Sequence, residues 1–174
     1  TQGKMKNDVA EGLQRYKHYI SIISDTLRQY RVPPIFAYIA FCESYMNNQF
    51  KNEKGDNTGI WNISDNIAAS YGLKITETED ERINISKATT VAAKYLRSLI
   101  EKFANRSFLL AMVSYRTGEA NTIFKLQKLG EADLQKNFWN LIRLGILGEE
   151  GETFLPKIFA IIIVAEDPLQ FNLE

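Results

Sequence analysis

Apolar residues at helical spacing run through almost the whole chain and restrict it to a mainly α fold. The longest set steps by four and three near the N-terminus: Val9, Leu13, Tyr16, Ile20, Ile23, Leu27 and Tyr30. The same spacing recurs in 84–103 and 108–115. Such steps place side chains on one face of a helix, and no alternating apolar and polar run indicates a strand. The first helix therefore needs a surface to pack on, either its own domain or a partner protein.

Proline, glycine and polar residues predict where the helices end. Pro33 and Pro34 end the first helix and begin the second, because proline is tolerated in the first turn of a helix. The segment 47–57 is rich in Asn, Lys, Gly and Asp and is predicted to be a loop. Further helices are predicted over 119–128, 133–144 and 154–166, with a glycine-containing loop over 145–151. The predicted division is an accessory amphipathic helix at 1–31 and a domain at 32–174.

The length and charge of the chain agree with one well-buried domain. With 174 residues, 45% of them hydrophobic, the chain is long enough for one core and short for two. Its 21 basic and 21 acidic side chains give a formal net charge of zero. This balance offers no electrostatic attraction to nucleic acid or to an anionic membrane surface, and it suits a neutral polymer better.

Few residues are available for metal or redox chemistry. Cys42 is the single cysteine and His18 the single histidine, and they fall in different predicted helices. No intrachain disulfide, no metal and no organic cofactor is therefore expected, and Cys42 is expected to be structural. The longest apolar run, 158–165, has eight residues, against the roughly 20 that cross a bilayer. Because the chain begins without Met, we expect its targeting segment to lie outside it.

One acidic residue interrupts an apolar helix. Glu43 follows Phe36, Ile39 and Ala40 at spacings of seven, four and three, so it shares their face of the helix. Its carboxyl therefore points where a core side chain is expected. Desolvation there disfavours the ionised form and raises the pKa, so that the glutamate can donate a proton near neutral pH. The alternative is a glutamate at the helix end that reaches solvent or an arginine.

An ordered series of short motifs follows Glu43. The motifs are Gly59-Ile60-Trp61-Asn62-Ile63-Ser64, Asp80-Glu81-Arg82, Ala88 to Leu96, Ser114-Tyr115-Arg116-Thr117-Gly118 and Glu152 to Ile158. In order and spacing the series resembles the lytic transglycosylase domain of the soluble, goose-lysozyme-like type, and within it the membrane-bound lytic murein transglycosylase D branch. The resemblance covers 32–174 and implies a lysozyme-like fold.

The resemblance implies a peptidoglycan lytic transglycosylase that cleaves the β-1,4 bond between N-acetylmuramic acid (MurNAc) and N-acetylglucosamine (GlcNAc). Most glycoside hydrolases need two carboxylates, whereas this family needs one, because the C6 hydroxyl of MurNAc is the nucleophile. By resemblance, Glu43 protonates the leaving oxygen and then removes the C6 hydroxyl proton, which leaves 1,6-anhydro-MurNAc ends. The implied location is the periplasmic side of the bacterial cell envelope. Glycan strands are the implied partner, and an envelope protein is a candidate partner for the N-terminal helix.

The same resemblance assigns further site residues. The hydroxyl of Tyr115 is expected to orient the catalytic carboxyl, and Ser44 is expected to help seat it. Trp61 and Ile63 are expected to line the sugar groove. Arg82 is expected to be structural and to tie a loop to a helix end.

Several positions depart from the family pattern within this expected substrate site. Asn62 replaces a glutamine that is one methylene longer, which can remove a hydrogen bond to the substrate. Arg116 and Thr117 replace the asparagine and the small residue after the motif tyrosine. Unless it points away, an arginine cation within about 4 to 6 Å of Glu43 would lower the pKa of that carboxyl by about one to three units. Phe154 replaces a tyrosine, so one hydroxyl that contacts sugar is lost.

These departures keep two other functions open. A catalytically degenerate transglycosylase-like domain, acting as a glycan-binding or scaffold module of an envelope machine, is favoured by the changes at Asn62, Arg116 and Phe154. A lysozyme-type hydrolase would use the same fold and leave reducing ends in place of anhydro ends.

Overall fold

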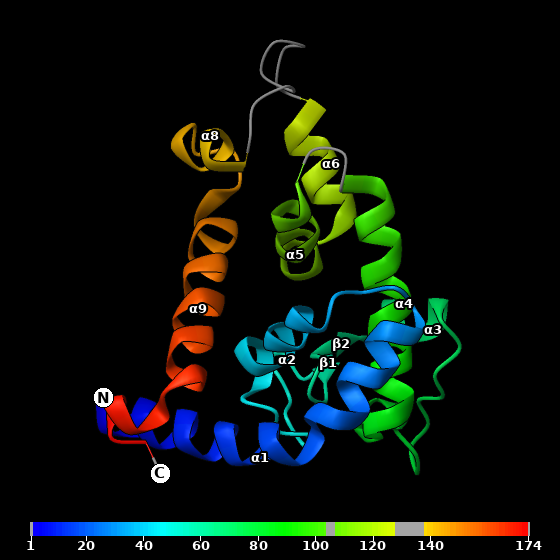
Figure 1. The fold of residues 1–174 in the computed structure, drawn as a ribbon. Helices are drawn as coiled ribbons and strands as arrows, with labels where there is room; N and C mark the ends of the chain where they lie inside the picture. The colour runs from blue at the N-terminus through cyan, green and yellow to red at the C-terminus, as the bar shows by residue number, and fades with distance from the viewer. Residues whose placement is uncertain (1, 104–106, 128–137, 174) are drawn as a thin grey trace. The chain divides into compact units, whose positions relative to one another are not determined.

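The computed structural model describes residues 2–103, 107–127 and 138–173, which form two compact units. The first unit is Thr1–Lys94 with Ala160–Glu174, and the second is Tyr95–Phe159. Their boundaries fall inside two long helices, α4 and α9. The fold is mainly helical, which confirms the prediction from the apolar spacing (Figure 1). The division into 1–31 and 32–174 stays a prediction.

The first unit begins with the predicted long helix, α1 (Gln2–Gln29). Leu13, Ile23 and Leu27 from its apolar seam are buried. The ring of Tyr16 stacks on that of Tyr38 in the next helix, with ring centroids 5.2 Å apart. Close packing is enforced at Gly12, since a Cβ atom there would lie 2.8 Å from the ring of a phenylalanine in α2. The helix is therefore docked on its own unit, and a protein partner for it stays a prediction.

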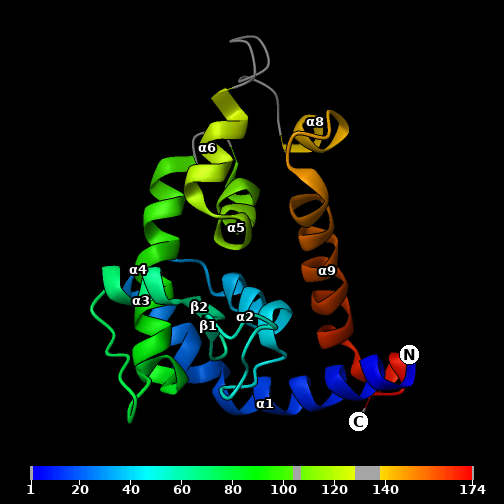
Figure 2. The ribbon, with the colours of Figure 1, turned by 180° about the vertical axis from the view of Figure 1, so that it is seen from behind.

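The short helix α2 is the centre of the first unit. A 3-10 turn, η1 (Pro34–Phe36), leads into α2 (Ala37–Ser44), as the two prolines predicted. Every residue of α2 except Cys42 is buried. Tyr45 ends the helix in the left-handed conformation, with φ 50°. Figures 1 and 2 both show α2 next to a small hairpin, β1 (Asn57–Thr58) with β2 (Ile63–Ser64).

Short elements connect the hairpin to the long helix α4. Ser64 caps α3 (Asp65–Ser70) by accepting a hydrogen bond from the backbone N–H of Ile67. Asp80 caps η2 (Glu81–Ile83) in the same way. The predicted helix over 84–103 is confirmed as α4 (Ile85–Phe103), which buries its apolar face. The hairpin was missed because each strand has only two residues, too few for a period to appear.

The second unit also consists of helices in the part that the structure describes. With the end of α4 it contains α5 (Phe108–Thr117), α6 (Glu119–Gln127), α8 (Phe138–Arg143) and the beginning of α9 (Gly148–Glu166). The helices predicted over 108–115 and 119–128 are thereby confirmed within the described residues. The hydroxyls of Ser114 and Thr117 lie 3.0 and 3.2 Å from that of Thr122, which ties α5 to α6.

The C-terminal part differs from the prediction. The loop predicted over 145–151 ends early, because α9 begins at Gly148, ahead of the predicted start at 154. Gly151 lies inside the helix because it packs closely: a Cβ atom there would lie 3.1 Å from the side chain of Val113 in α5. Of the helix predicted over 133–144, the part at 133–137 lies outside the described residues, and α8 forms the rest. No helix within the described ranges is long and apolar enough to cross a membrane.

Candidate active site

The site begins with Glu43 in the last turn of α2. Its side chain is buried, with 8% of its surface exposed. Oε2 accepts a hydrogen bond from the side-chain amide of Asn62 at 2.7 Å, and Oε1 is buried as well. The alternative of a glutamate that reaches solvent from the helix end is therefore wrong. A carboxyl that is removed from water and accepts a hydrogen bond from an amide is suited to exchange a proton with a bound molecule.

The loop that carries Asn62 is anchored to the helix that carries Glu43. The hydroxyl of Ser44, the residue after the glutamate, donates to the backbone oxygen of Ile60 at 2.8 Å. The side-chain amide of Asn57 donates to the backbone oxygen of Asn62 at 3.1 Å. Ser44 thus supports Glu43 indirectly, by fixing the loop that faces it.

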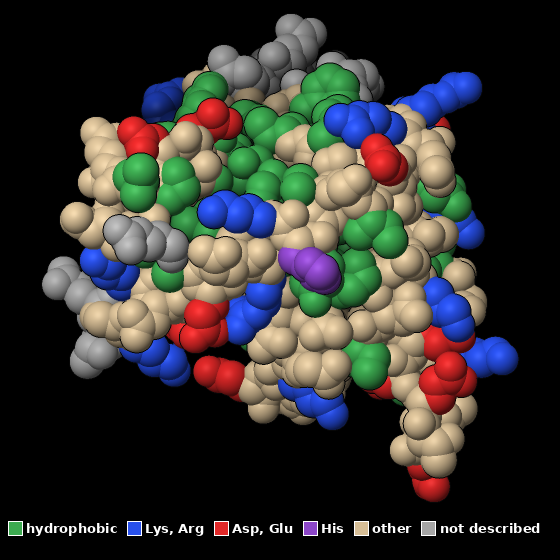
Figure 3. Space-filling view, turned by 60° about the horizontal axis from the view of Figure 1, so that its bottom comes forward, with side chains coloured by type: hydrophobic (Ala, Val, Ile, Leu, Met, Phe, Trp, Pro, Cys, Tyr) green, Lys and Arg blue, Asp and Glu red, His purple; other side chains and the backbone are tan. Residues whose placement is uncertain are grey.

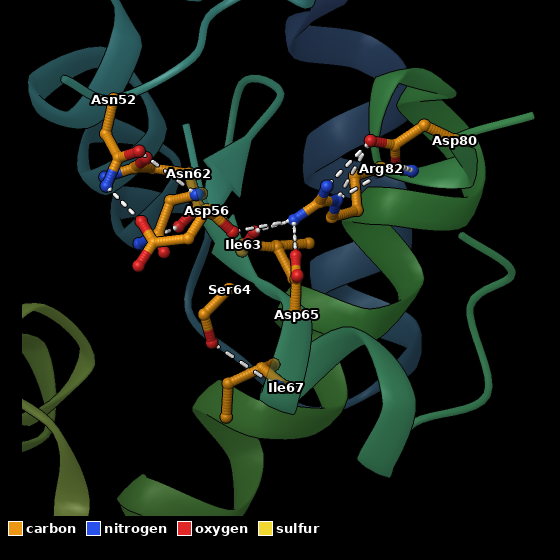
Figure 4. A network of polar contacts seen from close by, with 10 residues as sticks. Asn52, Asp56, Asn62, Ile63, Ser64, Asp65, Ile67, Asp80 and Arg82 are labelled. Carbon is orange, nitrogen blue, oxygen red and sulfur yellow. Dashed lines mark hydrogen bonds and ion pairs between the residues drawn. The ribbon is translucent and has the colours of Figure 1, made fainter. Parts of the chain in front are cut away.

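Arg82 pins the same loop from the other side, as Figure 4 shows. It is 5% exposed. Its Nη1 donates to the backbone oxygens of Asp56 and Ile63, at 2.8 and 3.2 Å, and to a carboxylate oxygen of Asp65 at 2.5 Å. Nε and Nη2 donate to the carboxylate of Asp80. The prediction that Arg82 ties a loop to a helix end is confirmed, since Asp65 begins α3.

The guanidinium and its partners stabilise each other's charged forms. Hydrogen bonds with Arg82 lower the pKa of Asp80 below its usual 3.8. The same pair raises the pKa of Arg82. Gly59 is required beside this network, because its φ is 79° and a Cβ atom would lie 2.2 Å from the backbone oxygen of Arg82.

Trp61 differs from its expected place. Its side chain is 0% exposed, and the indole Nε1 donates to the hydroxyl of Thr89 in α4 at 3.0 Å. Ile63 is 2% exposed. Neither side chain presents a face that a pyranose ring could stack on in this structure, so the expectation of two groove-wall side chains is corrected. Both side chains lie in the core, and Asn62 between them faces Glu43 from a left-handed turn.

The remaining predicted residues belong to the second unit. Tyr115, in α5, is half-buried, and its ring centroid lies 5.6 Å from that of Tyr95. Arg116 is exposed and forms an ion pair with Glu150, with 3.3 Å between Nη2 and Oε1. Phe154, in α9, is buried, with 5% exposure. As a sugar contact Phe154 does not fit this structure, because its ring is used in the core.

Two contacts of the site were not predicted from the sequence. The bond from Asn62 to Glu43 depends on the left-handed backbone of Asn62, with φ 50°. Thr89 gave no signal as the partner of the indole, because it is one of several small residues in α4. In the described part of the chain, no group of three His, Cys, Asp or Glu side chains is arranged to hold a metal ion.

The site thus consists of a buried acid at the end of a short central helix, with an anchored loop facing it. The model of the family described as "Transglycosylase SLT domain" matches residues 21–138. The chain therefore belongs to this transglycosylase family, and its lysozyme-like, mainly helical fold is the one that the sequence motifs implied. The match begins inside α1, so residues 21–29 of that helix belong to the matched region.

Curated relatives agree with the family. The chain is 25% identical, over 114 residues, to the membrane-bound lytic murein transglycosylase D of Escherichia coli strain K12. The same values hold for the protein of that name from Escherichia coli O6:H1. The aligned region is 66% of this chain and 24% of each relative. The chain thus corresponds to about a quarter of the length of these relatives.

Proposed function

We propose that the chain is a peptidoglycan lytic transglycosylase, which cleaves the MurNAc–GlcNAc β-1,4 bond and leaves 1,6-anhydro-MurNAc ends. The observation that carries this proposal is the buried carboxyl of Glu43, held at 2.7 Å by Asn62. Burial disfavours a charged carboxylate, and so does the position in the last turn of α2, where backbone carbonyls carry partial negative charge. Both effects favour a protonated acid before the reaction begins.

In the proposed reaction one carboxyl does the work of two. Glu43 gives its proton to the glycosidic oxygen while the bond from that oxygen to C1 of MurNAc breaks, so GlcNAc leaves with a free hydroxyl. The C6 hydroxyl oxygen of the same MurNAc then bonds to C1, and its proton passes to Glu43. The acid is regenerated and no water is consumed. Most glycosidases require a second protein carboxylate, but none takes part in these reaction steps.

A neutral glycan agrees with the charge of the chain. The formal net charge is zero, and acidic and basic side chains are interspersed over the face drawn in Figure 3. We propose action in the bacterial cell envelope, on its periplasmic side. Cell fractionation with a tagged protein tests this location, and recovery in the cytoplasm would contradict it.

Tyr115 is proposed to orient the carboxyl of Glu43 through its hydroxyl. Tyr115→Phe removes one hydrogen-bonding group and keeps the ring that packs on Tyr95. We expect the rate of anhydro-product release to fall by about 10-fold, the value of one hydrogen bond in the transition state. Tyr95→Phe is the matched control, because the same hydroxyl is removed from the neighbouring ring. Equal rates for Tyr115→Phe and the parent protein would exclude the role.

A second candidate function is a degenerate domain that binds glycan without turnover. The observation that favours it is Phe154, which replaces a sugar-contacting tyrosine of the family pattern and lies in the core. This candidate predicts sedimentation with purified sacculi and no soluble products.

Mass spectrometry of purified peptidoglycan after incubation with the protein tests the proposal. Anhydro-muropeptides are the expected products. Muropeptides with reducing ends would mean a lysozyme-type hydrolase. The absence of both, with binding to sacculi retained, would support the degenerate domain and overturn the proposed activity.

A further inference from the structure

Asn62 is the residue of the anchored loop whose amide reaches Glu43. We infer that Asn62 is a positioning residue, whose amide holds the carboxyl of Glu43 in the orientation from which it transfers a proton. This inference rests on the proposed function. It replaces the expectation that Asn62 binds the sugar. The asparagine that stands in place of the family's longer glutamine would instead position the carboxyl of Glu43.

The backbone aims the amide before any ligand binds. Asn62 adopts φ 50°, a left-handed conformation that asparagine tolerates better than most other residues. Its N–H donates to the backbone oxygen of Gly59 at 2.9 Å, which closes a tight turn. The amide of Asn57 holds its carbonyl oxygen at 3.1 Å. The main chain of Asn62 is thus fixed through both its N–H and its C=O.

The flanking residues remove the remaining freedom of the loop. Ile60 is bound through its backbone oxygen by Ser44, the residue next to Glu43. Trp61 is bound through its indole by Thr89, and Ile63 through its backbone oxygen by Arg82. The side chain of Asn62 is short, with few rotatable bonds, so a fixed main chain leaves its amide little choice of direction.

The burial of the amide favours positioning over a sugar contact. Nδ2 already donates to Glu43. Oδ1 is buried, and among the described residues it has no hydrogen-bond partner. A sugar hydroxyl could reach that buried oxygen only if the Asn62 side chain or its loop moved. The bond to Glu43 can persist through the reaction, because a carboxylate oxygen and the carbonyl oxygen of a carboxylic acid both accept an N–H.

Two substitutions separate the hydrogen bond from the backbone. Asn62→Asp keeps the shape and the tolerance of the left-handed conformation but removes the donor. Asn62→Gly keeps the backbone freedom and removes the side chain. We expect kcat for anhydro-product release from a soluble MurNAc–GlcNAc oligosaccharide to fall about 10- to 100-fold in both, with KM changed less than about 3-fold. Asn66→Asp is the matched control, because its side chain is exposed on α3; its kcat and KM should equal those of the parent protein.

A second readout does not depend on turnover. In ¹H–¹⁵N spectra, the side-chain amide signals of Asn62 are those missing from Asn62→Asp. In the parent protein they should shift as Glu43 ionises during a pH titration. In Glu43→Gln the pH-dependent shift should disappear, whereas the amide signals of Asn66 should be the same in both proteins.

The experiments distinguish a failure of the positioning role of Asn62 from a failure of the proposed transglycosylase activity. A raised KM with unchanged kcat in the Asn62 variants would mean a sugar contact and would overturn the inference. Unchanged kcat and KM would overturn it too, and so would Asn62 signals that are identical in the parent protein and Glu43→Gln. If the parent protein released no anhydro ends at all, the proposed function would fail, while the spectra would still decide whether Asn62 and Glu43 are paired.

Discussion

Glu43→Gln is expected to lower the release of anhydro-muropeptides by about 1,000-fold or more. Glutamine has the same shape and can still accept the amide hydrogen bond from Asn62, but it has no proton to give to the leaving oxygen. Loss of general acid catalysis costs about 100- to 10,000-fold, and here the same group also acts as the base. Product mass spectrometry against time, with the parent protein and the variant at equal concentration, measures the ratio.

The stability of the same variant distinguishes a catalytic loss from unfolding. Glu43 keeps a carboxyl in a site with 8% exposure, where a neutral amide costs less to desolvate. Glu43→Gln should therefore unfold at the same urea concentration as the parent protein or at a higher one. Glu53→Gln is the control, since that glutamate is exposed in the polar loop of the same unit and should leave the rate unchanged. Anhydro products at the parent rate from Glu43→Gln would contradict the proposed mechanism.

Helical periodicity explains why most of the fold could be predicted. The apolar seam has six residues within α1 and a similar length in α4, and it runs along one face over many turns, so the spacing of apolar residues is enough to predict these helices. The start of α9 could not be predicted in this way, because a glycine inside it looks like a break in a loop. The glycine is explained by tertiary packing, because Gly151 lets α9 approach Val113 in α5 closely.

At the site, the sequence predicted which residues take part better than it predicted where their side chains point. An acid within an apolar stripe singles out Glu43, and the structural role predicted for Arg82 agrees with its bonds to the backbone oxygens of Asp56 and Ile63. Trp61 was assigned to the surface, since its neighbours resemble a groove segment, but Thr89 supplies a buried partner for its indole. The direction of Asn62 depends on a positive φ, which no spacing of side chains reveals.

Arg82→Met is expected to lower the free energy of unfolding by about 3 kcal/mol, as when one partner of a buried ion pair is removed. Methionine fills a similar space without a donor. The carboxylate of Asp80 then loses its partner, and the backbone oxygens of Asp56 and Ile63 lose theirs. Asp65 adds little, because its side chain is 63% exposed and its ion pair is screened by solvent. Urea unfolding followed by circular dichroism measures the difference.

Two further variants identify the geometric cause. Arg82→Lys keeps the charge, but one ammonium group cannot reach Asp80 on one side and the carbonyl oxygen of Ile63 on the other, so we expect it to recover less than half of the loss. Arg28→Met removes an exposed arginine that pairs with Asp25 and should cost no more than about 0.5 kcal/mol. Equal stability of Arg82→Met and Arg28→Met would show that the anchored loop does not depend on the guanidinium.

The acid dependence of Arg82→Met provides the last test of the network. Arg82 lowers the pKa of Asp80 below 3.8 in the folded protein, so the unfolded chain takes up a proton at that carboxyl first as the pH falls. The contribution of the pair is fully present above about pH 4 and is lost as the pH falls through the lowered pKa. The stability difference between the parent protein and Arg82→Met should therefore be constant from pH 7 to 5 and smaller below pH 4. A difference that grew on acidification would mean that Asp80 does not stabilise the loop through Arg82.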